Sequence, residues 1–214
     1  MRLGIYGGTF DPVHYGHLLL AECCREQCQL DEVWFLPAAR PPHKTTQELA
    51  TGEQRVAMLR RAVEGHAGLA VSTLELDRGG ISYTVETLRE LRRLRPDATL
   101  FFLLGADAVR DLPTWREPAE IARLATLVTV QRPDAPAIAW EQLANLLDPA
   151  SWEAARRHAV LMPAMEISSS DLRRRVAQGL SIRFRLPPLV LDYIQQQQLY
   201  RPTQSTAARN LTVP

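Results

Sequence analysis

The chain has 214 residues, 46% of them hydrophobic, which is enough to bury a sizeable core within one domain. With 25 basic and 24 acidic residues the net charge is +1, so the strongly basic surface of a general nucleic-acid binder is missing. No apolar run approaches the about 20 residues that cross a bilayer, and the N-terminus shows no signal-peptide pattern. We therefore expect a cytoplasmic protein that binds neither nucleic acid nor a membrane, although local clusters could still bind small anions.

Strand and helix patterns alternate along the chain, which predicts parallel strands joined by right-handed crossovers. The expected strands are residues 2–6, 33–37, 69–72, 99–104, 124–131 and 159–162, and the expected helices are 15–27, 52–63, 85–94, 167–178 and 189–198. This order predicts an α/β fold, a Rossmann-like open parallel sheet with helices on both faces. We expect one domain over 1–200, with a possible peripheral excursion at 132–158, and a disordered tail at 201–214.

The turn between the first strand and the helix 15–27 has the features of a phosphate site. Gly7 and Gly8 would let the backbone approach a ligand and adopt positive φ. The N–H groups at the helix start attract an anion, and His14 and His17, three residues apart, would converge on one ligand. An ordinary turn with structural histidines is the alternative. A Walker P-loop and a dinucleotide fingerprint are excluded, because Gly-Lys-Ser/Thr and Gly-x-Gly-x-x-Gly are absent here.

The run from Gly7 to His17, with its His-x-Gly-His ending, resembles the signature of the nucleotidyltransferase superfamily that is related in fold to class I aminoacyl-tRNA synthetases. In detail the chain resembles the bacterial nicotinate-nucleotide adenylyltransferases, which join nicotinate mononucleotide to the AMP part of ATP. The resemblance covers roughly residues 1–200 and rests on motifs near both ends. It implies two catalytic histidines, His14 and His17, and ATP contacts at Gly7, Gly8, Thr9 and Phe10.

The proline-rich loop 38–50 follows the carboxyl end of the second strand and so emerges at the same edge of the sheet as the first turn. It carries Lys44, the only lysine of the chain. A compact ammonium there could reach a phosphate held by the first turn, although the loop could equally be an ordinary solvated one. In the resembling family this loop contacts the substrates, which implies a catalytic role for Lys44.

A short polar run leads from a connector at 74–80 into the helix 85–94. Ser82 or Thr84 could cap this helix, and a cap would explain the hydroxyls without any ligand. The same helix start could hold a pyridine carboxylate. The Ser-Tyr-Thr run matches the nicotinate-recognition segment of the family, which implies that Tyr83 and Thr84 bind the mononucleotide. Backbone N–H donors suit a carboxylate oxygen better than the NH2 of an amide, so we expect nicotinate to be preferred over nicotinamide mononucleotide.

The most apolar run, 99–104, predicts a central strand that ends at the ligand edge. Gly105 then allows close approach, and Asp107 could accept from a ribose hydroxyl or the adenine amine, or simply cap the short helix that follows. Family members carry a similar Gly-x-Asp at the nucleotide site, which implies that Gly105 and Asp107 bind ATP. Trp115 could fill a core gap; on the resemblance it stacks against the nicotinate ring, whose positive charge suits a flat π face.

A run of serines at the start of the expected helix 167–178 is the last motif in the chain. Their hydroxyls and the N–H groups of the helix start could grip a phosphate, whereas the alternative is a well-capped helix with solvated arginines. The run resembles the family motif Ile-Ser-Ser-Thr-x-Ile-Arg, with Ser170 in place of threonine and Leu172 in place of isoleucine. The resemblance implies ATP contacts by Ser168 and Ser169 and a catalytic role for Arg173.

The resemblance implies an enzyme that transfers AMP from ATP to nicotinate mononucleotide, giving nicotinate adenine dinucleotide and pyrophosphate in NAD biosynthesis. In-line attack by the mononucleotide phosphate needs alignment and charge neutralisation but no covalent intermediate. We expect Mg²⁺ held mainly by the ATP phosphates, because no carboxylate cluster in the sequence indicates a metal site built by the protein. The alternatives are a pantetheine-phosphate adenylyltransferase-like enzyme and a non-catalytic nucleotide-binding module on the same fold. A homo-oligomer is compatible with the sequence.

Overall fold

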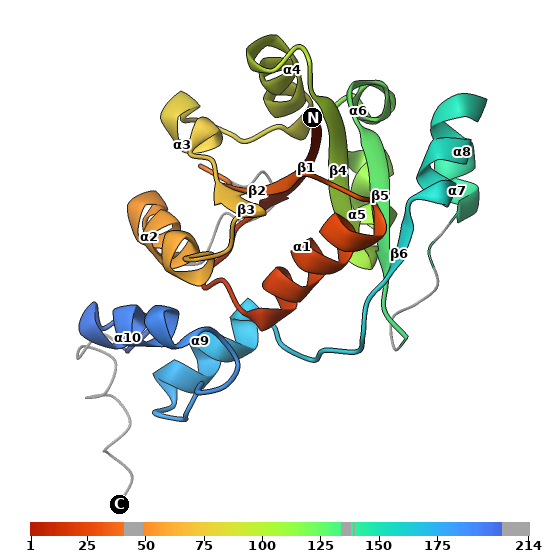
Figure 1. The fold of residues 1–214 in the computed structure, drawn as a ribbon. Helices are drawn as coiled ribbons and strands as arrows, with labels where there is room; N and C mark the ends of the chain where they lie inside the picture. The colour runs from red at the N-terminus through yellow and green to blue at the C-terminus, as the bar shows by residue number, and fades with distance from the viewer. Residues whose placement is uncertain (41–48, 134–137, 139, 203–214) are drawn as a thin grey trace, which may run out of the picture.

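The computed structural model describes residues 1–40, 49–133, 138 and 140–202. Figure 1 shows a central parallel sheet in the order β3-β2-β1-β4-β5-β6 with helices on both faces, which confirms the expected fold. The strands of the described residues are β1 (Arg2–Gly8), β2 (Glu32–Pro37), β3 (Leu69–Val71), β4 (Thr99–Gly105), β5 (Thr126–Gln131) and β6 (Ala159–Leu161). The helices are α1 (Tyr15–Gln27), α2 (Gly52–Ala62), α3 (Leu74–Arg78), α4 (Thr84–Leu94), α5 (Ala106–Asp111), the 3-10 helix η1 (Leu112–Thr114), α6 (Pro118–Leu124), α7 (Trp140–Ala144), α8 (Pro149–Arg157), α9 (Ser169–Ala177) and α10 (Pro188–Gln196).

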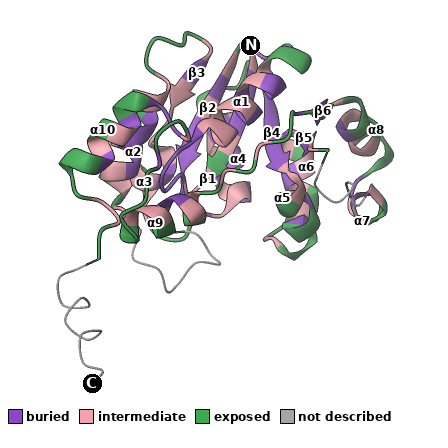
Figure 2. Cartoon of the chain, turned by 90° about the horizontal axis from the view of Figure 1, so that it is seen from below, coloured by how far each residue is buried: buried purple, intermediate pink, exposed green. Residues whose placement is uncertain are grey.

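The sheet is buried on both faces, and its side chains alternate between two apolar cores. In β4, Phe101 and Leu103 belong to the first core, whereas Phe102 and Leu104 belong to the second. Helices α1, α2, α9 and α10 contribute to the first core, and α4 to α8 contribute to the second. This double cover explains why the strands read as continuous apolar runs, and Figure 2 shows their buried residues in purple at the centre.

The strand order reverses direction between β1 and β4, which pair side by side in parallel. From β1 the chain moves outward to β2 and β3, and from β4 it moves outward the other way to β5 and β6. The connections that leave the carboxyl ends of these two strands therefore diverge and leave a crevice. Because β1 ends at Gly8 and β4 ends at Gly105, the two glycine segments singled out in the sequence meet there.

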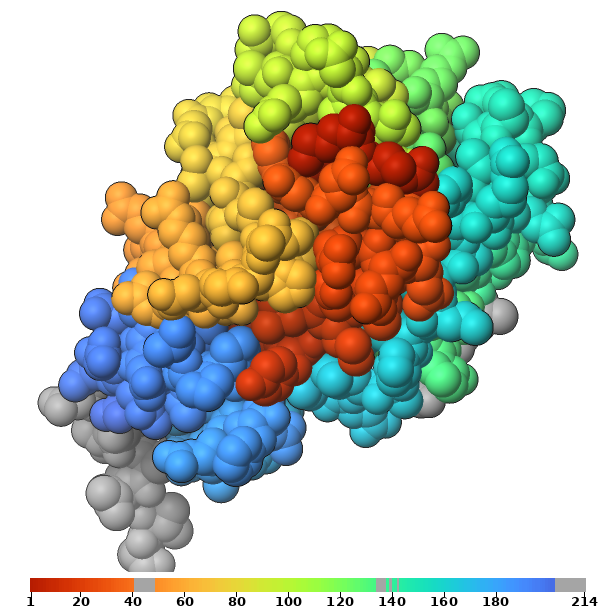
Figure 3. Space-filling model, viewed as in Figure 1, coloured from red at the N-terminus to blue at the C-terminus, as the bar shows by residue number. Residues whose placement is uncertain are grey.

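The last two helices, α9 and α10, pack near the N-terminal part of the chain. Helix α10 packs on α2, and Figure 3 shows the blue C-terminal surface against the orange surface of that region. Helix α9 begins beside the turn after β1, where the Ser169 hydroxyl donates to the Pro12 carbonyl at 2.9 Å. The Tyr15 N–H at the start of α1 donates to the Arg185 carbonyl at 3.2 Å. Segments more than 150 residues apart thus meet at the turn that follows β1.

Some local expectations about helix ends are wrong. The stretch 74–80, expected to be a connector, contains α3. The N-cap of α4 is Tyr83, and neither neighbouring hydroxyl caps the helix. The Ser82 hydroxyl instead accepts from the Ala39 N–H at 2.9 Å, so a partner 43 residues away takes the oxygen that local capping would use. Helix α10 ends at Gln196 rather than at residue 198.

Two further segments form helices. Residues 132–158, expected as a possible peripheral excursion, include α7 and α8, and their side chains Leu143 and Ala155 belong to the second core. The short helix expected to open at Ala108 begins at Ala106, with Gly105 as its N-cap, so Asp107 does not cap it. Among the described residues, none of the helices has the length and apolar character of a membrane span.

Candidate active site

The first turn gets its shape from a residue other than its two glycines. Gly7 and Gly8 are the last residues of β1, and the positive φ expected of them is absent. The left-handed residue is Phe10, with φ 51°, in a region where non-glycine residues are uncommon. Gly8 is needed because a Cβ there would lie 2.8 Å from the Phe10 ring. The turn therefore depends on close packing of Gly8 against Phe10, and this packing places Asp11 to His14 after it.

The side chain of Phe10, which is expected to contact ATP, lies in the first core. Only 2% of Phe10 is exposed, and its ring packs edge-on against His17 with centroids 5.1 Å apart. Tyr6 and Phe35 contact the same ring at 5.3 and 5.4 Å. Phe10 is apolar and β1 already places it at the first core, so burial is favoured over exposure to a polar ligand. Its role is to support His17.

The two histidines converge as expected: their rings stack with centroids 3.7 Å apart. The His14 N–H donates to Nδ1 of His17 at 3.3 Å, so neutral His17 carries its proton on Nε2, where it can donate to an anion. His14 is 5% exposed, and burial lowers its pKa to about 4. Its Nδ1 is buried without a hydrogen-bond partner among the described residues. His14 is therefore uncharged near neutral pH.

Gly16, between the two histidines, makes this stacking possible. A Cβ at Gly16 would lie 3.0 Å from Nδ1 and 3.1 Å from Cε1 of His14, which is tighter than ordinary van der Waals contact. Any side chain at this position would displace the His14 ring. The glycine in His-x-Gly-His is therefore a steric requirement of the pair.

The start of α9 faces the histidines across one cavity. Ser168 is the N-cap of α9, and its hydroxyl accepts from the Asp171 N–H at 3.2 Å. Arg173 donates to the Asp11 carbonyl at 2.6 Å, which fastens α9 to the first turn. The cavity, of about 490 Å³, is lined by predicted residues from both ends of the chain: Gly7, His14, His17, Gly105, Asp107, Ser168, Ser169 and Arg173. The expected convergence of the first turn and the serine-arginine helix on one site is present.

A second cavity, of about 520 Å³, adjoins the first. Its lining includes the predicted residues Gly8, Thr9, Tyr83, Thr84 and Trp115. Trp115 and Phe102 line both cavities, with ring centroids 6.1 Å apart, so these two aromatic residues mark where the cavities meet. Two adjoining cavities of this size suit two ligands that react with each other.

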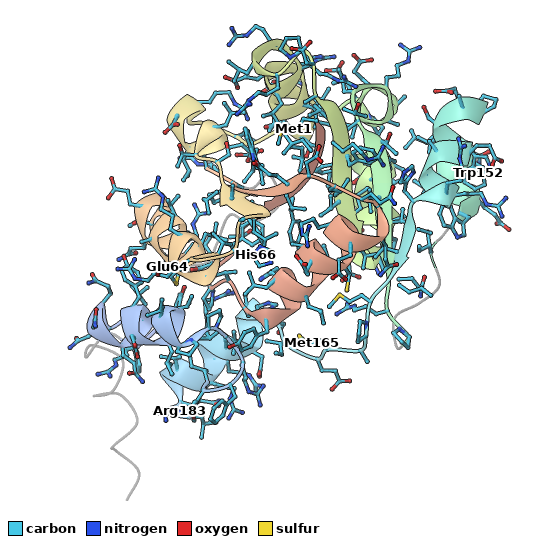
Figure 4. All side chains as sticks on the ribbon, in the orientation of Figure 1. Met1, Glu64, His66, Trp152, Met165 and Arg183 are labelled. Carbon is cyan, nitrogen blue, oxygen red and sulfur yellow. The ribbon has the colours of Figure 1, made fainter. Side chains whose placement is uncertain are left out.

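The remaining predicted residues are less enclosed or lie elsewhere. Asp107 lines both cavities, but its side chain is 76% exposed and forms an ion pair with Arg110 at 3.2 Å. Lys44, expected to be catalytic, lies outside the described residues. Met165, labelled in Figure 4, lies on the segment between β6 and α9 and lines the first cavity. Within the described ranges, no three His, Cys, Asp or Glu side chains gather closely enough to hold a metal ion.

Sequence reasoning missed several polar residues at or behind the site. Arg132 lines the first cavity, and its position just after β5 could have indicated this edge. Glu75 lines the second cavity, is 7% exposed and accepts from the Thr87 hydroxyl at 2.7 Å. The sequence did not predict a site role for Glu75, because the helical pattern of its segment is too weak to distinguish α3 from a connector. Asp11 and Arg55 are buried behind the turn, and no local pattern connects them.

Fold and site together define a nucleotidyltransferase, and comparison with known proteins agrees: the cytidylyltransferase-like family matches residues 5–175. Two proteins named "Probable nicotinate-nucleotide adenylyltransferase" are similar over nearly the whole chain. The one from Thermomicrobium roseum is 44% identical over 206 residues, 95% of this chain and 94% of its own length. The one from Thermus thermophilus is 45% identical over 201 residues, 94% of this chain and 100% of its own. The chain belongs to the nicotinate-nucleotide adenylyltransferase family.

Solved structures agree on the fold. The Plasmodium falciparum nicotinic acid mononucleotide adenylyltransferase complexed with NaAD has a TM-score of 0.72 at 20% sequence identity, covering 93% of this chain and 97% of that one. A Vibrio parahaemolyticus structure described as a putative nicotinate-nucleotide adenylyltransferase has a TM-score of 0.66 at 19% identity, covering 95% and 98%.

Proposed function

We infer that this protein transfers the adenylyl group of ATP to nicotinate mononucleotide, forming nicotinate adenine dinucleotide and releasing pyrophosphate. The observation that carries this inference is the pair of adjoining cavities, one with an anion-binding character and one with an aromatic wall. A triphosphate fits the first because imidazole, hydroxyl and guanidinium donors from two ends of the chain converge there. A pyridine ring fits the second, where Trp115 offers a flat π face.

The residues of the first cavity can align the reactants and neutralise charge. The mononucleotide phosphate would attack the α-phosphorus of ATP in line as the bond to pyrophosphate breaks. His17 donates from Nε2 to a phosphate oxygen, because its Nδ1 is occupied by the His14 N–H. Arg173 and the N–H groups at the start of α9 approach from the opposite side and take up charge on the leaving group. No proton transfer to the protein is required.

The mononucleotide would lie in the second cavity with its phosphate directed toward the first. Tyr83 and Thr84 stand at the start of α4, where backbone N–H groups without intrahelical partners can receive the nicotinate carboxylate. Trp115 at the junction would cover the ring. Glu75 and Asp111, which also line this cavity, add negative charge that favours the positive pyridinium ring.

The site is compatible with Mg²⁺ that is coordinated by the ATP phosphates. Because the described residues offer no cluster of three metal ligands, we propose that Mg²⁺ arrives bound to ATP and is held mainly by its phosphates. When bound it would neutralise part of the triphosphate charge. Lys44, outside the described residues, is proposed as a further phosphate contact from its place after β2. A cytoplasmic location is part of this proposal, and cell fractionation would test it.

Release of pyrophosphate in the presence of ATP and different acceptors would test the function directly. The panel comprises nicotinate mononucleotide, nicotinamide mononucleotide and pantetheine phosphate. We expect the fastest release with nicotinate mononucleotide. Faster release with pantetheine phosphate would assign the protein to the sibling reaction, and ATP binding without release for any acceptor would favour a nucleotide-binding module.

A further inference from the structure

The mechanism leaves a buried carboxylate in the first turn unexplained. Asp11 is 1% exposed, and its side chain lines neither of the two cavities formed by the described residues. Its Oδ1 accepts from the Tyr200 hydroxyl at 2.6 Å, and the Ala50 N–H approaches Oδ1 and Oδ2 at 3.3 and 3.4 Å. A buried carboxylate is costly unless it is hydrogen-bonded, so these donors are what retain it.

The backbone around Asp11 is held by side chains from two other elements. Arg55 of α2, only 3% exposed, donates to the Thr9 carbonyl at 3.0 Å and to the Ala50 carbonyl at 3.1 Å. Arg173 of α9 donates to the Asp11 carbonyl at 2.6 Å. Each of these partners is a charged donor, which makes the contacts stronger than neutral hydrogen bonds. The turn before His14 is therefore fastened from behind by α2, α9 and the segment after α10.

Left-handed backbone lies at Tyr200 and next to Asp11. Tyr200 has φ 64°, and Phe10, which immediately precedes Asp11, has φ 51°. Such conformations are unfavourable for residues with a side chain and persist only where the surroundings compensate. The hydrogen bond of 2.6 Å and the approach of the Tyr200 hydroxyl to Met58 Sδ at 3.8 Å are contacts that compensate at Tyr200.

We propose that Tyr200 is a positioning residue for catalysis: by donating to Asp11 it fixes the turn that carries His14 and His17 relative to Arg173. The proposal rests on the function inferred above. It adds to the site a residue that lies 186 positions after His14 in the sequence. Arg173 and Tyr200 bind the two ends of the same residue, its carbonyl and its carboxylate. A turn that loses one of these contacts shifts relative to α9, and small misplacements of reacting groups can cost up to about 100-fold in rate.

Tyr200→Phe is the central variant, because it removes one oxygen and keeps the ring. We expect kcat to fall about tenfold, with the KM values for ATP and nicotinate mononucleotide changed less than about twofold, since alignment matters more in the transition state than in binding. Tyr193→Phe on α10 is the matched control, because the Tyr193 ring packs on Arg61 at 4.3 Å and lies outside both cavities. Its kcat should equal that of the wild type.

A second measurement distinguishes an effect of Tyr200 on the position of the histidines from an effect on overall stability, and it does not depend on the proposed function. The chain has five histidines, so the imidazole C–H signals can be resolved by NMR in the protein without substrate. We expect the His14 and His17 signals to move in Tyr200→Phe and to stay in place in Tyr193→Phe. A lower Tm with unchanged kcat below that temperature and unmoved signals would overturn the proposal. An inactive wild type would contradict the function alone, because the NMR comparison still decides the positioning role.

Discussion

Nδ1 of His17 accepts a hydrogen bond from the backbone N–H of His14 at 3.3 Å, while the two imidazole rings stack 3.7 Å apart. The hydrogen bond sets the tautomer of His17, and the stacking buries His14. His17 is thereby oriented as a hydrogen-bond donor, and His14 packs against it as an uncharged ring. A motif of four residues is enough to set up this pair, because both contacts between the histidines are made within the first turn of α1.

The burial of His14 predicts a pH dependence of stability. The pKa of His14 lies at about 4 in the folded chain, below the ordinary 6.5, so between these values the unfolded chain binds more protons. The stability contribution of neutral His14 is complete above pH 6.5 and is lost as the pH falls toward 4, by up to about 3 kcal/mol. Urea unfolding at several pH values should show this loss in the wild type. His14→Asn should show a shallower decline over the same window; equal slopes would contradict the assignment.

His17→Ala should lower kcat by about 100-fold or more, because it removes a donor aimed at the phosphates. The chain should still fold, since the ring lies at the cavity wall. His66→Ala is the matched control: His66, labelled in Figure 4, precedes β3 at the opposite edge of the sheet and contacts Glu22 at 3.2 Å. Pyrophosphate release measures both variants. Near-normal kcat in His17→Ala would remove the catalytic assignment.

Gly16→Ala adds a Cβ that would lie 3.0 Å from His14 Nδ1. We expect the His14 ring to shift away from His17 and kcat to fall about tenfold or more, by misalignment of the pair. Gly68→Ala is the matched control, because its Cβ would also crowd a side chain, Arg25 Cδ at 2.7 Å, but Gly68 lines neither cavity. If the two alanine variants have the same kcat, the steric account of Gly16 is wrong.

Trp115→Ala should raise the KM for nicotinate mononucleotide about tenfold, because it removes the aromatic face at the junction of the cavities. The KM for ATP in the same variant acts as the internal control and should change much less. Initial rates with each substrate varied in turn give both values. A larger effect on ATP than on the mononucleotide would place the nucleotide base, rather than the pyridine ring, against Trp115.

The start of α4 predicts a strong preference for the acid over the amide mononucleotide. Tyr83 and Thr84 lie at the start of α4 and line the second cavity; a carboxylate would accept from backbone N–H groups there, whereas an amide NH2 would not. The ratio of kcat/KM for nicotinate and nicotinamide mononucleotide measures the preference, which we expect to exceed about tenfold. Equal values for the two substrates would contradict this account of the pocket.

Much of the site follows from patterns that are local in the sequence. The strand β4 is recognisable as a buried run, and a glycine-histidine turn after β1 and a serine-rich start of α9 carry recognisable motifs. The rule that parallel sheets bind ligands at the carboxyl ends of their strands then brings these segments to one edge. The cap of α4 and the burial of Phe10 are different, because each depends on a partner from another segment: Ala39 for Ser82, and Phe35 for Phe10.

The sequence by itself determined the order of strands and helices, the chemical character of the first turn and of the start of α9, and the family, because these depend on periodicity and on contiguous motifs. Only the tertiary structure decided that Phe10 is buried under His17, that His14 is neutral, that Arg55 meets Thr9 and that Tyr200 meets Asp11. Those contacts join residues 46 and 189 positions apart, in the pairs Thr9 with Arg55 and Asp11 with Tyr200. Burial and long-range hydrogen bonds arise only when separate elements pack together, and no local pattern encodes them.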